Sequence, residues 1–200
     1  MYSILSRDCR LVSLLNGLGN ISEKIMAKRL VYIAETQGLL HSEQMGGRSG
    51  RSAVDPVMVL VHDVQQAKCN GKVLSALFVD VKGAFYHVSR IQLLLILQSL
   101  DFPPAVLSWT DSFLSDRQLG LAFDGQSQPL QPIKTGIPQG IHISPILFLF
   151  YLTNLFKDLK PSLLTSQLRS PSFINDVALI ITRPSKEANS KALEMAARKA

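Results

Sequence analysis

The sequence predicts an α+β fold. Apolar residues make up 46% of the 200 residues, which is enough to form a core and argues against disorder. The strands and helices that the residue pattern indicates follow one another in mixed order rather than in strict alternation. No internal repeat, low-complexity tract or clear linker divides the chain, so we expect one large domain or part of a multi-lobed one.

Charge and cysteine content narrow the partners and the compartment. Lys and Arg total 21 against 15 Asp and Glu, a net charge of +6 that permits a polyanionic partner without requiring one. Cys9 and Cys69 are far apart and form no metal-ligand pattern, which indicates a reducing compartment. We expect an intracellular location, nuclear or cytoplasmic. We expect no signal peptide and no membrane partner, because the apolar runs are far shorter than the roughly 20 residues that a membrane span needs.

The first predicted helix begins near Ser22, whose hydroxyl can cap it, and ends near Gly38. Helical spacing directs four of its apolar side chains inward: Ile25, Met26, Leu30 and Ile33.

A glycine-rich cationic loop, residues 45–52, follows this helix. Its arginines, Arg48 and Arg51, and its backbone amides suit phosphate binding, although a solvated surface loop explains the composition equally well. Ser52 and Asp55 resemble a capping box at the start of a second helix. The side chains that this helix is expected to bury are Val57, Leu60, Val61 and Val64.

The central strand of the predicted sheet is the apolar run from Val73 to Val79. The turn signal Asn70–Gly71 leads into it, and its content of Val, Leu and Phe is typical of a strand covered on both faces. Asp80 follows at the end of the strand, where a ligand or a metal could reach it. The simpler interpretation is that Asp80 only ends the strand.

Three more helices are predicted between this strand and residue 159. Ser89 can cap the first of them, and its inward side chains are expected to be Ile91, Leu94 and Leu95. Pro103–Pro104 opens the second. Ser144–Pro145, a capping hydroxyl followed by proline, marks the start of the third, which is apolar nearly all round and therefore expected to be buried over 146–159.

Two hairpins and a last helix complete the prediction. Alternation in residues 119–123 followed by Asp124–Gly125 predicts the first hairpin. Two apolar runs that flank Asn175–Asp176 predict the second. Ser185 can cap the last helix, whose apolar stripe consists of Ala188, Ala192, Met195 and Ala196.

Five blocks of the chain resemble the reverse transcriptases of non-LTR (LINE-type) retrotransposons. Three carry the palm motifs: FVDVKGAF (78–85), GIPQG with SPILFLFY (136–151) and FINDVALI (173–180). Two are similar to fingers segments of the same family: residues 13–30 and 44–52. One such block would be weak evidence, but five in the family's order and at about its spacing are specific, and they cover nearly all of the chain.

This resemblance implies a right-hand polymerase fold. The fingers-like segment would be residues 1–72, and the palm would be residues 73–200 with part of the fingers inserted. An antiparallel palm sheet would pack against helices. The last predicted helix stops in mid-course, so we expect a truncated fragment in which the thumb is absent.

The resemblance also implies RNA-directed DNA polymerase activity with an RNA template, a DNA primer and dNTP as partners. Two Mg²⁺ ions would promote in-line attack of the primer 3′-hydroxyl on the α-phosphate. Asp80 and Asp176 would bind them, and Asn175 stands at the position of a further family aspartate. Phe85 would discriminate against a ribose 2′-hydroxyl, and Gln139 would line the nucleotide pocket. Arg48 and Arg51 would approach the triphosphate, and Arg10 would contact the template.

The sequence departs from the family pattern at several positions. Asn175 is the most consequential, because an amide is neutral and offers a single ligating oxygen, so we expect weakened metal binding and a severe loss of rate. Tyr86 replaces an acidic residue, Ile141–His142 replaces a small residue and proline, and Leu11 replaces proline. Three hypotheses follow: a working polymerase, an inactive relic with residual nonspecific nucleic-acid binding, and an α+β domain that neither binds nor catalyses.

Overall fold

A computed structural model describes residues 13, 15–120, 122–123, 126–127, 129–159 and 168–198. Arg10, Leu11 and the Asp124–Gly125 turn, which the sequence analysis singled out, lie outside these residues. Helices combined with antiparallel strands confirm the α+β prediction.

The described residues form seven α-helices and seven β-strands. The helices are α1 (Gly17–Thr36), α2 (Val54–Cys69), α3 (Arg90–Ser99), α4 (Pro104–Leu114), α5 (Ile143–Tyr151), α6 (Thr153–Asp158) and α7 (Lys186–Ala197). The strands are β1 (Val73–Asp80), β2 (Gln118–Leu119), β3 (Ala122–Phe123), β4 (Gln126–Ser127), β5 (Gln131–Pro132), β6 (Ser172–Phe173) and β7 (Asp176–Arg183). None of these helices has the length and hydropathy to cross a membrane.

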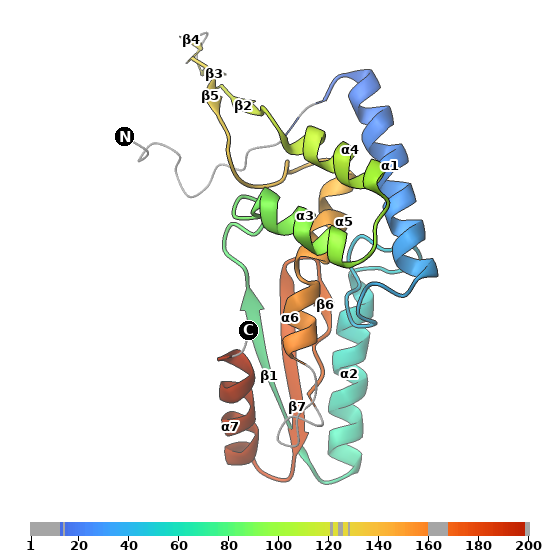
Figure 1. Cartoon of the computed structure of the whole chain (residues 1–200). Helices are drawn as coiled ribbons and strands as arrows, with labels where there is room; N and C mark the ends of the chain where they lie inside the picture. The colour runs from blue at the N-terminus through green and yellow to red at the C-terminus, as the bar shows by residue number, and fades with distance from the viewer. Residues whose placement is uncertain are drawn as a thin grey trace.

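The main sheet has three antiparallel strands in the order β1-β7-β6. Among the described strands β7 is therefore central, and the prediction that residues 73–79 form the central strand is wrong. Both β1 and β7 are eight-residue strands rich in apolar residues, so composition alone does not tell which one lies in the middle. Figure 1 shows them as the two long strands, with α7 on one side and α2 on the other.

Helix α7 covers one face of this sheet. Its small core consists of Leu159, Val177, Leu179, Ile181, Ala192, Leu193 and Ala196. The buried Asn189 side chain also donates from Nδ2 to the Val73 carbonyl oxygen at 2.8 Å, which ties α7 to the start of β1. Helix α2 faces the opposite side of the sheet, but Phe78 there is 69% exposed. The prediction of a strand covered on both faces is therefore wrong at the end that carries Asp80.

A larger core forms where α1, α3, α4 and α5 meet, in the upper half of Figure 1. Helix α5 is buried nearly all round, as its apolar sequence predicts. The helix is interrupted at Leu152, so the single helix predicted over 146–159 is instead α5 followed by α6. Helix α5 also begins one residue before Ser144, whose hydroxyl donates to the Pro138 carbonyl oxygen and does not cap the helix.

Helix α1 supplies the missing cap of α5 from outside the segment. The fully buried Glu23 carboxylate accepts a hydrogen bond from the Ile143 amide at 2.9 Å, and its other oxygen lies 2.9 Å from His142 Nδ1. A negative charge at a helix N-terminus is favourable because the first amides lack partners within the helix. No local pattern in the sequence links residues this far apart.

The helix boundaries follow local capping signals in most cases. Ser89 and Ser185 cap α3 and α7 as predicted, and Asp55 accepts the Ser52 amide hydrogen bond at 2.6 Å. Helix α1 begins earlier than predicted, because Asn16 rather than Ser22 caps it, with its Oδ1 accepting from the Gly19 amide at 2.7 Å.

The predicted buried faces of three helices are wrong in part. Exposed side chains that were predicted to be inward are Ile25 on α1, Val57, Val61 and Val64 on α2, and Ile91 and Leu95 on α3. The α3 side chains that are buried are Leu93, Ile96 and Leu97. These helices carry apolar residues on more than one face, so the spacing predicts a helix but leaves its rotation to the neighbouring elements.

Strands β2 to β5 form an extended arm. β2 pairs with β5 and β3 pairs with β4, both antiparallel, which confirms the first predicted hairpin. Figure 1 shows this arm projecting from the helical part of the molecule, away from the main sheet.

Candidate active site

Two carboxylates lie opposite each other at one end of the main sheet. Asp80 is the last residue of β1, Asp176 is the first residue of β7, and the antiparallel register pairs them directly. Directly opposed residues project to the same face, with Cα atoms about 4.5–5.5 Å apart. Both aspartates are exposed. The fold therefore brings together two acidic residues that are far apart in the sequence.

Asn175 lies in the two-residue turn between β6 and β7, next to this pair. The partners Phe173 and Asp176 close the turn, and Ile174 takes a left-handed conformation with φ of 57°. The Asn175 amide donates from Nδ2 to Asp80 Oδ1 at 3.2 Å. An aspartate in this turn would add a third negative charge beside Asp80, whereas the amide provides a hydrogen-bond donor.

The loop before α2 packs against this turn and against the residues that lead into it. The Ser172 amide donates to the Glu43 carbonyl oxygen at 2.8 Å, and the Met45 amide donates to the Ser172 carbonyl oxygen at 2.9 Å. Gly46 follows, and a Cβ atom there would lie 2.6 Å from the Ile174 amide nitrogen. Because only glycine permits this approach, the loop holds the turn closely.

Phe85 and Gln139 lie on adjacent loops. The Ile137 amide donates to the Phe85 carbonyl oxygen at 2.7 Å, and the Phe85 ring packs on Phe148 with the ring centroids 5.3 Å apart. The Tyr86 hydroxyl donates to Gln139 Oε1 at 2.9 Å. Tyr86 appeared in the sequence only as a departure from a family pattern, and its contact with Gln139 was not predicted.

Arg117 is a further residue that the sequence analysis missed. Its guanidinium donates to the carbonyl oxygens of Thr135 and Gly136, at the start of the loop that carries Gln139. Burial lowers the pKa of Arg117 from its usual value. Arg117 is distant from this loop in sequence, and no local motif indicates the contact.

Arg48 and Arg51 lie in the loop before α2, and their environments differ. The Arg48 side chain is only 9% exposed and forms a bidentate ion pair with Glu35, with both distances 2.7 Å. Its Nη1 atom also donates to the carbonyl oxygens of His41 and Gln44. Arg51 is exposed in the same loop. Arg48 thus ties the loop to the end of α1, and the predicted contacts of both arginines with a triphosphate stay predictions.

The ion pair with Arg48 changes the acidity of Glu35. The hydrogen bond from Arg48 lowers the pKa of the Glu35 carboxyl, burial opposes that shift, and the charges of Arg48 and Arg51 add to it. A carboxyl whose pKa is lower in the folded chain stabilises the fold above its ordinary pKa, here 4.5, and this contribution is lost as the pH falls through the folded-state value.

Glu35→Gln is therefore expected to make stability less sensitive to acid below about pH 4.5. Urea unfolding at several pH values from 6 down to 3 measures the free energy of unfolding, which should fall less steeply with pH in the variant than in the native chain. In an Arg48→Met background the same substitution should have little further effect on that fall. An equal effect in both backgrounds would contradict the coupling between Glu35 and Arg48.

A cleft of about 410 Å³ begins beside the two aspartates. Helix α2 forms one wall with Pro56, Val57 and Leu60, and the sheet forms the other with Phe78 and Ala178. Asp80 and Asp176 line the same cleft. An exposed apolar wall thus adjoins a site of concentrated negative charge.

The residues of this site fit one hard cation better than two. Mg²⁺ is commonly held by one or two carboxylates together with substrate phosphates, and Asp80 with Asp176 meets that requirement. Within the described parts of the chain, no cluster of three or more His, Cys, Asp or Glu side chains could hold a metal. The neutral Asn175 leaves a second ion without a carboxylate of its own.

Comparison with known proteins identifies the family of the chain. The family profile described as "Reverse transcriptase (RNA-dependent DNA polymerase)" matches residues 6–200. The chain belongs to the reverse transcriptase family. Together with the two relatives described next, this match confirms the resemblance to the reverse transcriptases of non-LTR retrotransposons.

Two curated relatives of this reverse transcriptase-family chain come from Drosophila melanogaster. The "Probable RNA-directed DNA polymerase from transposon X-element" is 30% identical over 143 residues, which cover 71% of the chain and 16% of the relative. The "RNA-directed DNA polymerase from mobile element jockey" is 28% identical over 146 residues, which cover 73% of the chain and 16% of the relative. The chain thus spans about a sixth of the length of these relatives.

Proposed function

We propose that this chain carries the nucleotidyl-transfer site of an RNA-directed DNA polymerase. The observation that carries the proposal is the direct pairing of Asp80 and Asp176 at the exposed end of the main sheet. In this proposal residues 1–72 act as a fingers-like segment and residues 73–200 as the palm. An RNA template, a DNA primer and dNTP are the partners.

Asp80 and Asp176 would hold Mg²⁺ in this function. The bound metal would supply positive charge at the reacting phosphate and lower the pKa of the primer hydroxyl. The Asn175 amide would orient Asp80 through its hydrogen bond and would contribute no charge. Two divalent ions would then face a net charge of −2 from these side chains instead of −3, so we expect weak binding of the second ion and a severe loss of rate.

The two loops beside the sheet would bind the nucleotide. Phe85 is held against Phe148, so its ring has a fixed position from which to exclude a ribose 2′-hydroxyl. Gln139 would line the nucleotide pocket, with its side chain oriented by Tyr86. Arg51 is exposed and would approach the triphosphate, whereas Arg48 would first have to exchange its contacts with Glu35.

A second candidate function is nonspecific nucleic-acid binding by a catalytically inactive retroelement relic. The hydrogen bond from Asn175 to Asp80 favours it, because a donor stands where the reaction needs a metal ligand. The net charge of +6 supports binding through phosphates, which should weaken steeply as salt is added. This relic would bind a primer–template duplex but would not extend the primer.

The test combines two measurements. Electron paramagnetic resonance measures Mn²⁺ binding, and a primer-extension assay on an RNA template measures activity. Asp80→Asn is expected to weaken Mn²⁺ binding by on the order of tenfold or more, because it removes one of two ligating charges. Asp158→Asn, at an exposed carboxylate on α6, is the matched control and should change nothing. Mn²⁺ affinity that does not respond to Asp80→Asn would overturn the proposal. Salt-sensitive duplex binding without extension would favour the relic.

A further inference from the structure

We propose that Arg169 and Glu43 are positioning residues that hold the turn before Asp176 against the loop that precedes α2, and so orient the Asn175 amide toward Asp80. This inference rests on the proposed function, because it concerns the same pair of carboxylates. Neither residue belongs to a block that the sequence analysis assigned to the site.

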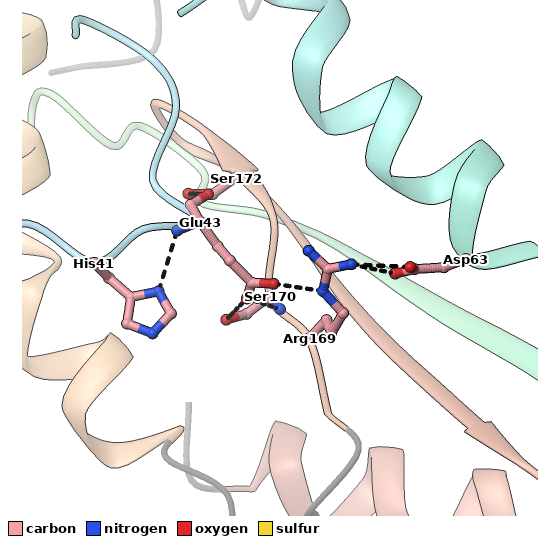
Figure 2. A network of polar contacts seen from close by, with 6 residues as sticks. All are labelled: His41, Glu43, Asp63, Arg169, Ser170 and Ser172. Carbon is pink, nitrogen blue, oxygen red and sulfur yellow. Dashed lines mark hydrogen bonds and ion pairs between the residues drawn. The ribbon is translucent and has the colours of Figure 1, made fainter. Parts of the chain in front are cut away.

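Arg169 connects the loop before α2 to α2 itself. Its Nε atom lies 2.8 Å from Glu43 Oε1, and its Nη1 atom lies 2.9 and 3.0 Å from the two Asp63 carboxylate oxygens. Figure 2 shows the guanidinium between these two acids, with Asp63 projecting from α2 and Glu43 from the loop before it. One arginine thus joins the loop, helix α2 and the segment that leads into β6.

Glu43 carries this connection to the turn. Its second carboxylate oxygen accepts hydrogen bonds from the Ser170 amide at 2.6 Å and the Ser170 hydroxyl at 3.1 Å. Its backbone carbonyl oxygen accepts the Ser172 amide hydrogen bond at 2.8 Å. Glu43 therefore binds the chain at two points just before the turn, and Gly46, three residues later, packs against Ile174.

The segment before the turn, which contains Arg169 and Pro171, is also hydrogen-bonded to the central strand β7. Arg169 and Ile180 exchange backbone hydrogen bonds at 2.8 Å in both directions, and the Ala178 amide donates to the Pro171 carbonyl oxygen at 3.0 Å. Since β7 begins with Asp176, the segment before the turn and the strand after it are held as one unit. The position of that unit relative to the loop depends on Glu43.

The electrostatics of the cluster make Arg169 hard to replace. Burial lowers the pKa of Arg169, but the hydrogen bond that Arg169 donates to Glu43 and the charges of Asp63 and Glu43 more than offset it, so the pKa is raised. The Glu43 and Asp63 side chains are only 14% and 16% exposed. Without the guanidinium, two mostly buried carboxylates would face each other with no cation between them. Glu43 is then expected to move away from Asp63 and to release Ser170.

The experiment compares variants of Arg169 with a matched ion pair elsewhere. Arg169→Met removes the charge and keeps the aliphatic length, and Arg169→Lys keeps the charge but loses the forked geometry. Arg90→Met is the control, because Arg90 forms a 2.6 Å ion pair with Asp111 and the pair joins α3 to α4. Each variant is measured at a temperature at which circular dichroism shows it to be folded.

Two readouts separate this inference from the proposed function. The first is Mn²⁺ affinity at the Asp80 site: Arg169→Met is expected to weaken it by on the order of tenfold, the low end of the range for residues outside the direct ligands, with a smaller loss for Arg169→Lys. The second needs no metal. The NMR signals of the Asn175 side-chain amide, which report its hydrogen bond to Asp80, should shift in Arg169→Met and stay unchanged in Arg90→Met.

Unchanged Asn175 amide signals in both Arg169 variants would overturn the inference, whatever the metal does. So would an equal change in Arg90→Met, since that would indicate general destabilisation. If the amide signals respond to Arg169 but the native chain shows no Asp80-dependent Mn²⁺ binding, the positioning role stands and the proposed function fails. If Mn²⁺ binding depends on Asp80 but neither readout responds to Arg169, only the positioning role fails.

Discussion

Asn175→Asp is expected to tighten divalent metal binding by about tenfold or more and to raise primer extension by about 100-fold. The substitution replaces a hydrogen-bond donor to Asp80 by a third carboxylate of nearly the same size. It would add the negative charge that a second Mg²⁺ ion would need in the proposed two-metal mechanism. Mn²⁺ titration of the native chain and the variant measures the first effect, and extension of a DNA primer on an RNA template measures the second.

The same substitution should also change stability in a metal-dependent direction. Without divalent metal, three carboxylates at the end of one sheet repel one another, so the melting temperature of the variant should lie below that of the native chain. Added Mg²⁺ should raise the melting temperature of the variant more than that of the native chain, because a ligand that binds only the folded state stabilises it.

An Asn175→Asp/Asp80→Asn double variant is the control, since it restores the original charge while losing a ligand. It should show neither the tighter metal binding nor the gain in extension. Metal affinity that is the same in the native chain and in Asn175→Asp would contradict the assignment of this turn to the metal site.

Gly136→Ala is expected to lower the free energy of unfolding by about 2–6 kcal/mol, a large part of the stability of an ordinary domain. Two costs combine at this position. Gly136 has a φ of +82°, which an alanine rarely adopts, and an added Cβ atom would lie 2.9 Å from the Phe85 carbonyl oxygen and 2.8 Å from that of Tyr86. Since neither oxygen can move without moving the backbone, the loops that carry Phe85 and Gln139 should separate.

Two other glycines isolate these costs. Gly38 has a φ of +61° with open space around its Cβ position, so Gly38→Ala measures the conformational cost alone. Gly17 lies in α1 with open space and no left-handed conformation, so Gly17→Ala should be neutral or slightly stabilising. Urea unfolding of the three variants should rank Gly136→Ala as the most destabilised. A loss no larger than that of Gly38→Ala would show that the contact between the loops is not tight.

The elements that sequence reasoning predicted well are those with strong local signals. Ser89 and Ser185 each begin a helix as predicted, because an N-terminal hydroxyl satisfies amides that the helix itself leaves unpaired. The apolar composition of α5 correctly predicted burial all round. The rotation of α3 was not predictable in this way, because the uninterrupted apolar run Leu93–Leu97 reaches every face of the helix, and the packing of α4 and α5 selects which of these side chains are buried.

At the candidate site, the sequence indicates the candidate functional residues but not the contacts that hold them in place. Asp80, Asn175 and Asp176 were identified as candidates from their motifs, and their roles in metal binding stay proposals. The buried Glu23 cap, the Tyr86 contact with Gln139 and the Arg169 cluster carry no local signature, since each joins residues far apart in the chain.

By itself, the sequence determined the fold class and the family, and the family resemblance led us to expect an aspartate at the position of Asn175. Those properties depend on residue identity and on order along the chain. Only the tertiary structure decided that Asp80 directly faces Asp176, that the Asn175 amide donates to Asp80, and that Arg48 is engaged with Glu35 rather than presented to solvent. These outcomes depend on strand register and on packing between residues that are far apart in the sequence. Many contacts across the fold determine both, so no short segment predicts them.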